Sequence, residues 1–482
     1  MMEEKLPKGW IETTLGEIAK WGSGGTPSRS KSEYYNGNIP WIKTGDLNDS
    51  IITEASEFIT ELGLKNSSAK LFPKGSIGLA MYGATIGKTA FFGIDAATNQ
   101  ACAVAQPYEV INDKFLHNYL KSQKRNFIDQ GKGGAQPNIS QTLIKAHPIL
   151  LPPLSEQNRI VAKLDALFGH LDVLREKLDR IPVLLKNFRQ QVLTQAVTGE
   201  LTKEWREYSS FKGEKHSDAE EIIERLNKKR ESLVKLKKIR KVILKQTDKN
   251  DNLGDLPNSW VKVSLIEVAN IIDPNPSHRM PEYVSDGIPF ISTENIKGSQ
   301  LDFQKGKKVT QRTLEEQIKR FEIKEGDFLF TRIGTIGKSC YLPTMREYAL
   351  SHAVCIISSY LPDQLHPSFL KIILSSKLIL DQSQDGIQSV GVPDLGMGKV
   401  RAFQIPLTSV EEQQEVVNRV EALGSLADKI ESQYQSLKNK IDQLPKAVLA
   451  KAFRGELVEQ EVKEYVREVG ELGMVAEGNF NK

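Results

Sequence analysis

The chain has 482 residues, of which 39% are hydrophobic and 26% charged, which is enough apolar material for real cores and excludes a mostly disordered chain. Lys and Arg number 65 against 61 Asp and Glu, and the resulting net charge of +4 argues against a histone-like polycation and against an acidic solvating protein. A length of this order predicts about three or four domains.

Cysteines and apolar runs narrow the class of protein further. Cys102, Cys340 and Cys355 are too few and too scattered for a disulfide framework or a four-ligand zinc site. No apolar run approaches the roughly 18–20 residues of a membrane-spanning helix, and no apolar signal core follows the first charged residues. We therefore expect a soluble, cytoplasmic, multidomain protein.

The sequence contains an internal duplication. Six segments of the first half return in the same order in the second half, among them LPKGWIETTLGEIAKW, which returns as LPNSWVKVSLIEVANI, and ILLPPLSEQNRIV, which returns as IPLTSVEEQQEVV. The offset drifts only from 249 residues (Ile39 to Ile288) to 256 residues (Gln157 to Gln413). Two copies are too few for a solenoid, so we infer one duplicated unit.

The first part of each copy predicts a globular domain, at residues 1–154 and 253–408. Short apolar runs such as SIGLAMYG and GDFLFTRI alternate with Gly, Pro, Asn and Asp, which favours a mixed α/β or mostly β domain. KFLHNYLKS (114–122) and SFLKIILSS (368–376) are candidates for short helices inside it.

The second part of each copy predicts a long helix, within regions 155–252 and 409–462. Apolar residues recur there in alternating steps of three and four, the heptad pattern of a helix that packs along another helix. We expect the two helical regions to pack on each other, and an antiparallel arrangement would put one globular domain at each end of a rod. The expected spacer or subunit-contact positions are Leu164, Leu167, Leu171, Leu174, Leu178, Leu423, Ile430, Leu437 and Ile441.

Serine caps and prolines predict where these helices begin and where they kink or restart. We expect them to begin after a serine cap, Ser155 in one copy and Ser409 in the other. Pro182 and Pro445 each remove a backbone donor and should kink or restart the helix.

A basic segment lies between the copies. Arg225–Lys245 holds ten basic residues and one acidic residue, so it carries +9 while the rest of the chain carries −5. Leucines and isoleucines at helical spacing predict a basic amphipathic helix, which is either a solvated face beside the coiled coil or a helix near a phosphate backbone. The acidic end, residues 463–482, lacks periodicity and is expected to be a disordered tail.

Signatures of catalysis are missing from the sequence. GATIGKT resembles a phosphate-binding loop, but Walker spacing requires glycine where Tyr82 stands, and strand-like residues follow. We interpret it as a β-hairpin whose glycines allow a tight turn. There is no amino-methyltransferase signature, nucleotide fingerprint or histidine pair at metal-ligand spacing. We expect no catalytic residue, metal or cofactor in this chain.

Two similar but diverged domains suit a DNA target with two different half-sites. Polar side chains near expected loop ends are candidates for base or phosphate contacts, although each can equally satisfy its own backbone in a turn or simply face solvent. The candidate DNA-binding residues are Lys43, Thr44, Asn48, Lys88, Lys132, Gln136, Asn138, Thr293, Asn295, Arg332, Lys338 and Gln388.

Several motifs together point to a known protein family. They are LPKGW followed by LGEIA, IPWIKTGDL, the paired glycine hairpins, PLSEQNRIVAKLDAL and FRQQVLTQAVTGELTKEWR. Over about residues 5–460 the chain resembles the specificity (S) subunit of Type I restriction-modification enzymes. The resemblance implies an α+β fold, a tandem duplication of a mixed α/β target recognition domain followed by a long helix, with the two helical regions packed as an antiparallel coiled coil. It also implies that each domain reads one half of an asymmetric bipartite DNA target.

Partners also follow from the resemblance. The helical regions would set the spacing and dock modification subunits, two being the expected number, and restriction subunits would complete the assembly. S-adenosylmethionine, ATP and Mg²⁺ would belong to those partner subunits. One departure is that TGELTKEWR is matched only by RGELVEQ, so Trp205 has no counterpart. Two alternatives stay open: a self-contained DNA-modifying enzyme with an unrecognised site, or a coiled-coil scaffold without a nucleic-acid role.

Overall fold

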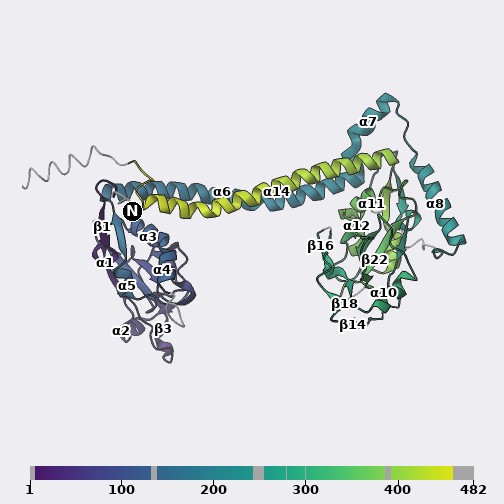
Figure 1. The fold of residues 1–482 in the computed structure, drawn as a ribbon. Helices are drawn as coiled ribbons and strands as arrows, with labels where there is room; N and C mark the ends of the chain where they lie inside the picture. The colour runs from purple at the N-terminus through teal and green to yellow at the C-terminus, as the bar shows by residue number, and fades with distance from the viewer. Residues whose placement is uncertain are drawn as a thin grey trace, which may run out of the picture. The chain divides into compact units, whose positions relative to one another are not determined.

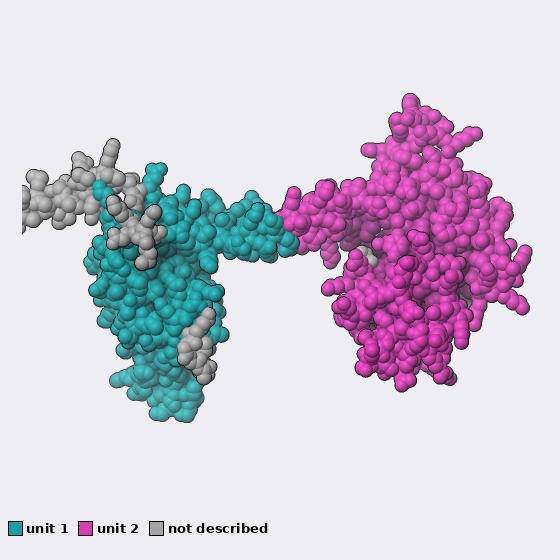
Figure 2. All heavy atoms as spheres, in the orientation of Figure 1, with its two compact units in different colours: residues 1–179, 435–482 teal, residues 180–434 magenta. Residues whose placement is uncertain are grey.

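The computed structural model describes residues 6–131, 138–242, 254–277, 279–298, 300–385 and 392–459. The chain forms two compact units, residues 1–179 with 435–482 and residues 180–434 (Figure 2). Each unit holds one globular domain of strands and short helices together with parts of two long helices. The expected α+β class and the tandem duplication are confirmed. Within the described residues, no helix is both long enough and apolar enough to span a membrane.

The globular domain of the first unit, here the first domain, is built on two sheets (Figure 1). Their strand orders are β2-β10-β7-β8-β4 and β5-β3-β9-β6, and a separate pair β1-β11 joins the two ends of the domain. The strands are β1 Ile11–Thr14, β2 Ala19–Ser23, β3 Tyr35–Ile42, β4 Ile51–Ile52, β5 Phe58–Ile59, β6 Leu71–Phe72, β7 Ile77–Ala80, β8 Thr89–Phe92, β9 Ala96–Thr98, β10 Cys102–Pro107 and β11 Pro148–Leu151. The helices are α1 Leu15–Ile18, α2 Glu61–Lys65, α3 Asp113–Ser122, α4 Lys124–Gln130 and α5 Gln141–Lys145.

The second domain, in the second unit, repeats this topology. Its sheet β13-β22-β19-β20 matches β2-β10-β7-β8, and β12-β23 matches β1-β11. The strands are β12 Val261–Ser264, β13 Ala269–Ile272, β14 Tyr283–Val284, β15 Ile288–Ile291, β16 Ile296–Lys297, β17 Gln300–Leu301, β18 Lys307–Val309, β19 Phe328–Thr331, β20 Ser339–Tyr341, β21 Ala349–Leu350, β22 Val354–Ser359 and β23 Gln404–Leu407. The helices are α9 Leu265–Val268, α10 Gln311–Ile318, α11 Pro367–Leu374, α12 Lys377–Asp385 and α13 Met397–Ala402.

The short helices predicted inside each domain are confirmed as α3 and α11. Asn112 begins α3 because its side chain accepts a hydrogen bond from the Phe115 N–H at 3.0 Å. Phe115, Leu116 and Leu120 then lie fully buried against the central sheet of the first domain. Burial on both faces explains why the central strands read as continuous apolar runs rather than as alternating patterns.

The remaining helices connect and follow the domains. They are α6 Leu154–Thr198, α7 Lys203–Lys212, α8 Ala219–Lys235 and α14 Val410–Ala452. The long helices α6 and α14 lie side by side (Figure 1). In the first unit Arg175 pairs with Asp442 at 3.8 Å, and in the second unit Arg189 pairs with Asp428 at 2.8 Å. Residue numbers therefore rise along α6 as they fall along α14, which confirms the antiparallel packing.

The heptad seam buries only one of its two positions per repeat. On α6 every seventh residue is buried, namely Leu164, Leu171, Leu178, Leu185 and Val192, and on α14 the matching set is Ala427, Tyr434 and Ile441. Leu167 and Leu423 are half-buried. The intervening Leu174, Ile430, Leu437 and Leu444 are 38–46% exposed. Each helix therefore carries a buried apolar row and a second apolar row that is only partly covered, with the larger exposure on α14.

The starts and interiors of the long helices partly differ from expectation. Ser409 caps α14, since its Oγ accepts a hydrogen bond from the Glu412 N–H at 3.2 Å. Ser155 is not a cap, because α6 already begins at Leu154. Neither proline restarts its helix: Pro182 and Pro445 lie inside continuous helices, where packing along the neighbouring helix offsets one lost hydrogen bond.

The basic helix is shorter than expected. Helix α8 ends at Lys235, and Lys237 adopts a left-handed backbone with φ of +56°, which ends a right-handed helix. The end of the expected segment, residues 243–245, lies outside the described residues. Its apolar face is confirmed in part, since Leu226 is buried in the core of the second domain and Leu233 and Ile239 pack against that core, whereas Leu236 is exposed.

A buried polar contact fixes the first domain to the start of α6. The Trp10 indole donates to Glu156 Oε1 at 3.1 Å. Next to it, Gln157 accepts from the Asn112 N–H at 2.8 Å and donates to the Pro152 carbonyl at 2.9 Å. We call this cluster the first junction. It explains why the sequence keeps a tryptophan before β1 and a Glu-Gln pair at the helix start.

The second junction repeats these contacts at the start of α14. The Trp260 indole donates to Glu412 Oε2 at 2.9 Å, and Gln413 accepts from the His366 N–H at 2.9 Å. Glu412 also accepts from the hydroxyls of Thr202 at 2.7 Å and Thr408 at 2.8 Å, and it pairs with Arg206. Thr202 and Arg206 belong to the TGELTKEWR segment, so this segment has a structural role beside Glu412.

Candidate nucleic-acid interface

The glycine motifs form hairpins, as predicted. In the first domain β7 and β8 pair antiparallel, and Gly83 and Gly87 in the connecting turn have φ of +64° and +76°. In the second domain β19 and β20 pair in the same way, with φ of +79° at Gly334 and +88° at Gly337. Because L-residues with side chains disfavour such angles, these turns require glycine. The motif is a turn and not a phosphate loop followed by a helix.

Several loops of the first domain meet at the end of its sheet that carries this hairpin. The Asn99 N–H donates to the Ile42 carbonyl at 3.1 Å, which ties the loop after β9 to the end of β3. The Met81 N–H donates to the Ala101 carbonyl, and the Ile139 N–H donates to the Met81 carbonyl, both at 2.9 Å. We call the loops gathered here the first rim: residues 24–30, 43–50, 81–88, 99–101 and 138–140.

The second domain holds its loops with the same main-chain bonds. The Ser351 N–H donates to the Ile291 carbonyl at 2.9 Å, the Arg332 N–H to the Ala353 carbonyl at 3.0 Å, and the Leu395 N–H to the Arg332 carbonyl at 2.8 Å. We call residues 292–297, 332–338, 351–353 and 393–396 the second rim. Motifs that the sequence separates by tens of residues therefore lie together in both domains.

Most of the candidate residues of the first domain lie on the first rim. Lys43 pairs with Glu57 at 3.0 Å, and Asn48 is exposed and accepts from the Ser50 hydroxyl at 2.6 Å. Thr44 and Lys88 are half-buried, and Asn138 is exposed beside the hairpin. Lys132, Gln136 and, in the second domain, Gln388 lie outside the described residues.

Charge pairs brace the first rim. Glu57 bonds to Arg29 and Lys43, and these cations hold the pKa of the Glu57 carboxyl down at about 2. Asp49 ties the 43–50 loop to the hairpin, because its carboxylate accepts from the Thr89 N–H at 2.9 Å and from Lys124 at 2.8 Å. Burial acts to raise the pKa of Asp49, but these hydrogen bonds outweigh it and the pKa is lowered.

Two candidate DNA-binding residues of the second domain, Arg332 and Asn295, are buried and bonded to other parts of the domain. Arg332 is 2% exposed and binds Asp394 at 3.0 Å, at the place where the first domain has the buried Met81. Asn295 is fully buried, and its amide donates to the carbonyls of Asp302 at 2.9 Å and Lys305 at 2.6 Å. Both side chains hold loops together, whereas their contact with DNA stays a prediction.

The other two candidates of the second domain lie at its rim. Lys338 is exposed at the end of the hairpin, and Thr293 is half-buried next to Gly334. Sequence reasoning missed other rim residues, notably Arg29, which stacks over Tyr35 with 4.4 Å between the guanidinium carbon and the ring centroid. It also missed Gln100 and His352, although NQA and SHA occupy matching places before β10 and β22.

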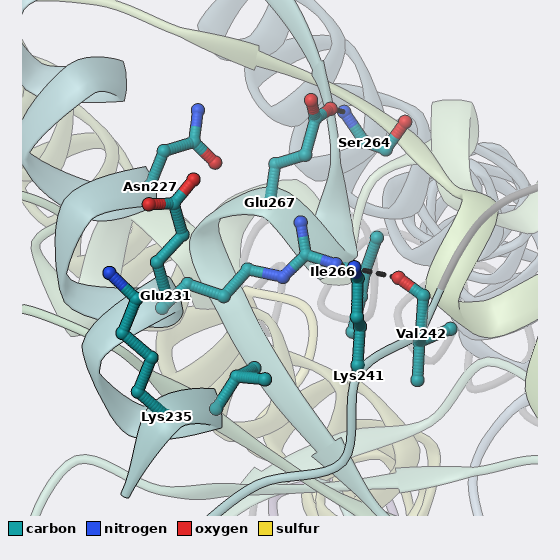
Figure 3. A pocket seen from close by; sticks show the side chains of 10 residues that line it. Asn227, Glu231, Lys235, Lys241, Val242, Ser264, Ile266 and Glu267 are labelled. Carbon is teal, nitrogen blue, oxygen red and sulfur yellow. Dashed lines mark hydrogen bonds between the residues drawn. The ribbon is translucent and has the colours of Figure 1, made fainter.

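A cavity of about 560 Å³ in the second unit lies between α8 and α9 (Figure 3). Its lining mixes Arg230, Lys235 and Lys241 with Glu231 and Glu267. Arg230 donates to the Val242 carbonyl at 2.8 Å, and Glu267 accepts from the Ser264 N–H at 2.7 Å. The first bond ties α8 to the segment that follows it, and the second belongs to the capping box at the start of α9.

Comparison with known proteins agrees with this architecture. The Escherichia coli K12 Type I restriction enzyme EcoKI specificity subunit is 26% identical over 475 residues, covering 95% of this chain and 92% of its own. The EcoBI specificity subunit from Escherichia coli is 28% identical over 376 residues, covering 76% of this chain and 70% of its own. The crystal structure of the HsdS subunit from Thermoanaerobacter tengcongensis has the same fold, with a TM-score of 0.57 at 18% identity over 94% of this chain and 99% of that one.

The family assignment rests on both copies of the repeat. A family model, the Type I restriction modification DNA specificity domain, matches residues 7–183 and again residues 257–439. Each match covers one globular domain and the larger part of the helix that follows it. This chain therefore belongs to the family of Type I restriction-modification DNA specificity proteins.

Proposed function

We propose that this chain is the DNA sequence-specificity subunit of a Type I restriction-modification complex. Each domain reads one half of an asymmetric bipartite target, the first rim one half-site and the second rim the other. The observation that carries the proposal is that the two rims share one main-chain framework but present different side chains. Paired modules of this kind suit two unlike half-sites on one duplex.

The chemistry resides in partner subunits under this proposal. Methylation and cleavage, with S-adenosylmethionine, ATP and Mg²⁺, belong to modification and restriction subunits, and the complex assembles in the cytoplasm on double-stranded DNA. The relatives EcoKI and EcoBI are named as specificity subunits of Type I restriction enzymes, which supports this division of labour.

The helical pair is the proposed docking surface for two modification subunits. In the first unit Leu174, Leu437 and Leu444 are 41–46% exposed on a helix pair whose other apolar row is already buried. A second apolar row of this kind is expected to be covered by further helices. Leu437→Gln should weaken co-purification of a modification subunit while the chain stays folded, and the exposed Gln433→Ala serves as the control. Unchanged co-purification would place the docking surface elsewhere.

A methylation map tests the whole proposal. Cells that carry the modification subunit are compared with and without this chain, and methylated positions are read across the genome. We expect one bipartite sequence, methylated only when both proteins are present. Methyl transfer by this chain alone, or binding of S-adenosylmethionine to it in calorimetry, would instead favour a self-contained enzyme.

Salt-dependent DNA binding tests the scaffold alternative. Contacts to several phosphates make affinity fall steeply as salt rises, because condensed counterions are released on binding. A complex whose DNA affinity is absent at low salt would support a coiled-coil scaffold without a nucleic-acid role.

A further inference from the structure

We propose that Gln100 reads an adenine in the half-site bound by the first domain, and that Thr26 positions its side chain. This inference rests on the proposed function and adds to it a named residue and a base. Gln100 lies at the centre of the 99–101 loop on the first rim and is exposed.

The loop that carries Gln100 is held on both sides. The Asn99 N–H bonds to the Ile42 carbonyl at 3.1 Å and the Ala101 carbonyl accepts from the Met81 N–H at 2.9 Å. Asn99 and Cys102 also close a turn, with 3.3 Å between the Cys102 nitrogen and the Asn99 oxygen. These bonds hold the backbone of Gln100 in place, while its side chain is exposed to solvent.

The side chain itself is oriented by a neighbouring loop. The Thr26 hydroxyl donates to Gln100 Oε1 at 2.6 Å. Thr26 is held in place because the Gly25 N–H donates to the Thr98 carbonyl at 2.9 Å. The preceding Gly24 packs so closely that a Cβ there would lie 1.9 Å from the Thr98 oxygen. Loop 24–26 is thus pressed against the strand that leads into Gln100.

This arrangement matches the edge of adenine. A carboxamide can accept from the adenine N6 amino group and donate to N7 at the same time. An amide oxygen has two lone pairs, so Gln100 Oε1 can keep the Thr26 hydroxyl and still accept from N6, while Nε2 is directed to N7. The Thr26 hydroxyl therefore holds the Gln100 carboxamide in one orientation, which lowers the loss of side-chain entropy on DNA binding.

The second domain has the same loop with other chemistry at the matching position. Ser351 and Ala353 make the main-chain bonds of Asn99 and Ala101, and His352 stands where Gln100 stands. The two ring nitrogens of an imidazole point in diverging directions, so they cannot make the two parallel hydrogen bonds of a carboxamide with one base edge. The framework is kept while the reading group changes, as expected for a position that distinguishes two half-sites.

The test uses the complex of the full chain with its modification subunits. Binding competition is measured with duplexes in which each base pair of the target is changed in turn, alongside the genomic methylation map. Gln100→Ala should lose roughly tenfold discrimination at one A·T pair of one half-site, with the other half-site and the spacer unchanged. Thr26→Val should show a smaller loss at the same pair. Gln106→Ala, near the opposite end of β10, is the control and should behave as the unaltered chain.

Three outcomes would overturn the inference. Gln100→Ala could keep full discrimination at every base pair, lose it equally in both half-sites, or weaken binding to all duplexes alike, as a phosphate contact does. The proposed function fails separately, and only if the unaltered complex marks no bipartite sequence.

Discussion

The two junctions keep the same Trp, Glu and Gln but differ in electrostatics. At the second junction Glu412 is 2% exposed and receives Trp260, Thr202, Thr408 and Arg206, so its charge is paired and hydrogen-bonded. At the first junction the equally buried Glu156 accepts from Trp10, and burial raises the pKa of its carboxyl. The two junctions share the same geometry. At the second junction, Thr202 and Arg206 from the segment after α6 add a hydrogen bond and a positive charge to the buried Glu412.

Removal of the two glutamates should produce the largest contrast. Glu412→Ala leaves the Arg206 guanidinium without its buried partner and should cost about 3–5 kcal/mol in the second unit. Glu156→Ala removes the acceptor of the Trp10 indole and should cost about 1–3 kcal/mol in the first unit. Hydrogen exchange measured on β12 and β23, and on β1 and β11, reports each unit separately. Equal losses would show that Arg206 adds nothing at the second junction.

The pH dependence of stability should also differ between the two junctions, by less than the effect of removing the glutamates. Because the pKa of Glu156 is raised in the folded state, its contribution to stability is present below its unfolded pKa of about 4.3 and is lost as pH rises through the folded value. Glu156→Gln keeps an acceptor for Trp10 and should make the first unit less sensitive to pH as it rises above about 4.3. The exposed Glu109→Gln is the control for hydrogen exchange across this range. An unchanged pH profile would mean that Glu156 does not titrate there.

The smallest effect is expected on DNA binding, when the hairpin lysine of each rim is replaced. Lys88→Ala and Lys338→Ala should each lower DNA affinity about equally for all sequences and reduce the salt slope by about 0.9, the value for one phosphate contact. Titrations at several salt concentrations measure this. A change for Lys338, which is exposed, without one for the half-buried Lys88 would show that the rims approach DNA differently.

Periodic and turn signals in the sequence were sufficient for the framework. The duplication, the hairpins at Gly83 and Gly334 and the pairing of the long helices follow from repeated segments, glycine turns and heptad spacing, whereas the antiparallel direction of the pair was implied by the family resemblance. The early start of α6 and the uninterrupted helix at Pro182 depend on packing against a neighbour. Local propensity therefore could not predict them.

The candidate site was harder to predict because exposure is a property of the whole domain. Arg332 stands just before the glycine turn in the sequence, where exposure is expected, yet it fills the place of Met81 and is buried with Asp394. Gln100 was missed because a three-residue loop between strands has no motif, and its neighbour Thr26 lies 74 residues away. The matched NQA and SHA segments were the available signal.

The rims are held by main-chain bonds, and this has a consequence for substitutions on them. The three main-chain hydrogen bonds of the 99–101 loop, and their equivalents around 351–353, do not involve the side chain of the middle residue. A substitution at Gln100 therefore removes the bond from Thr26 but leaves these main-chain bonds in place. Under the proposed function, such a change would alter the base that is read while the loop keeps its position.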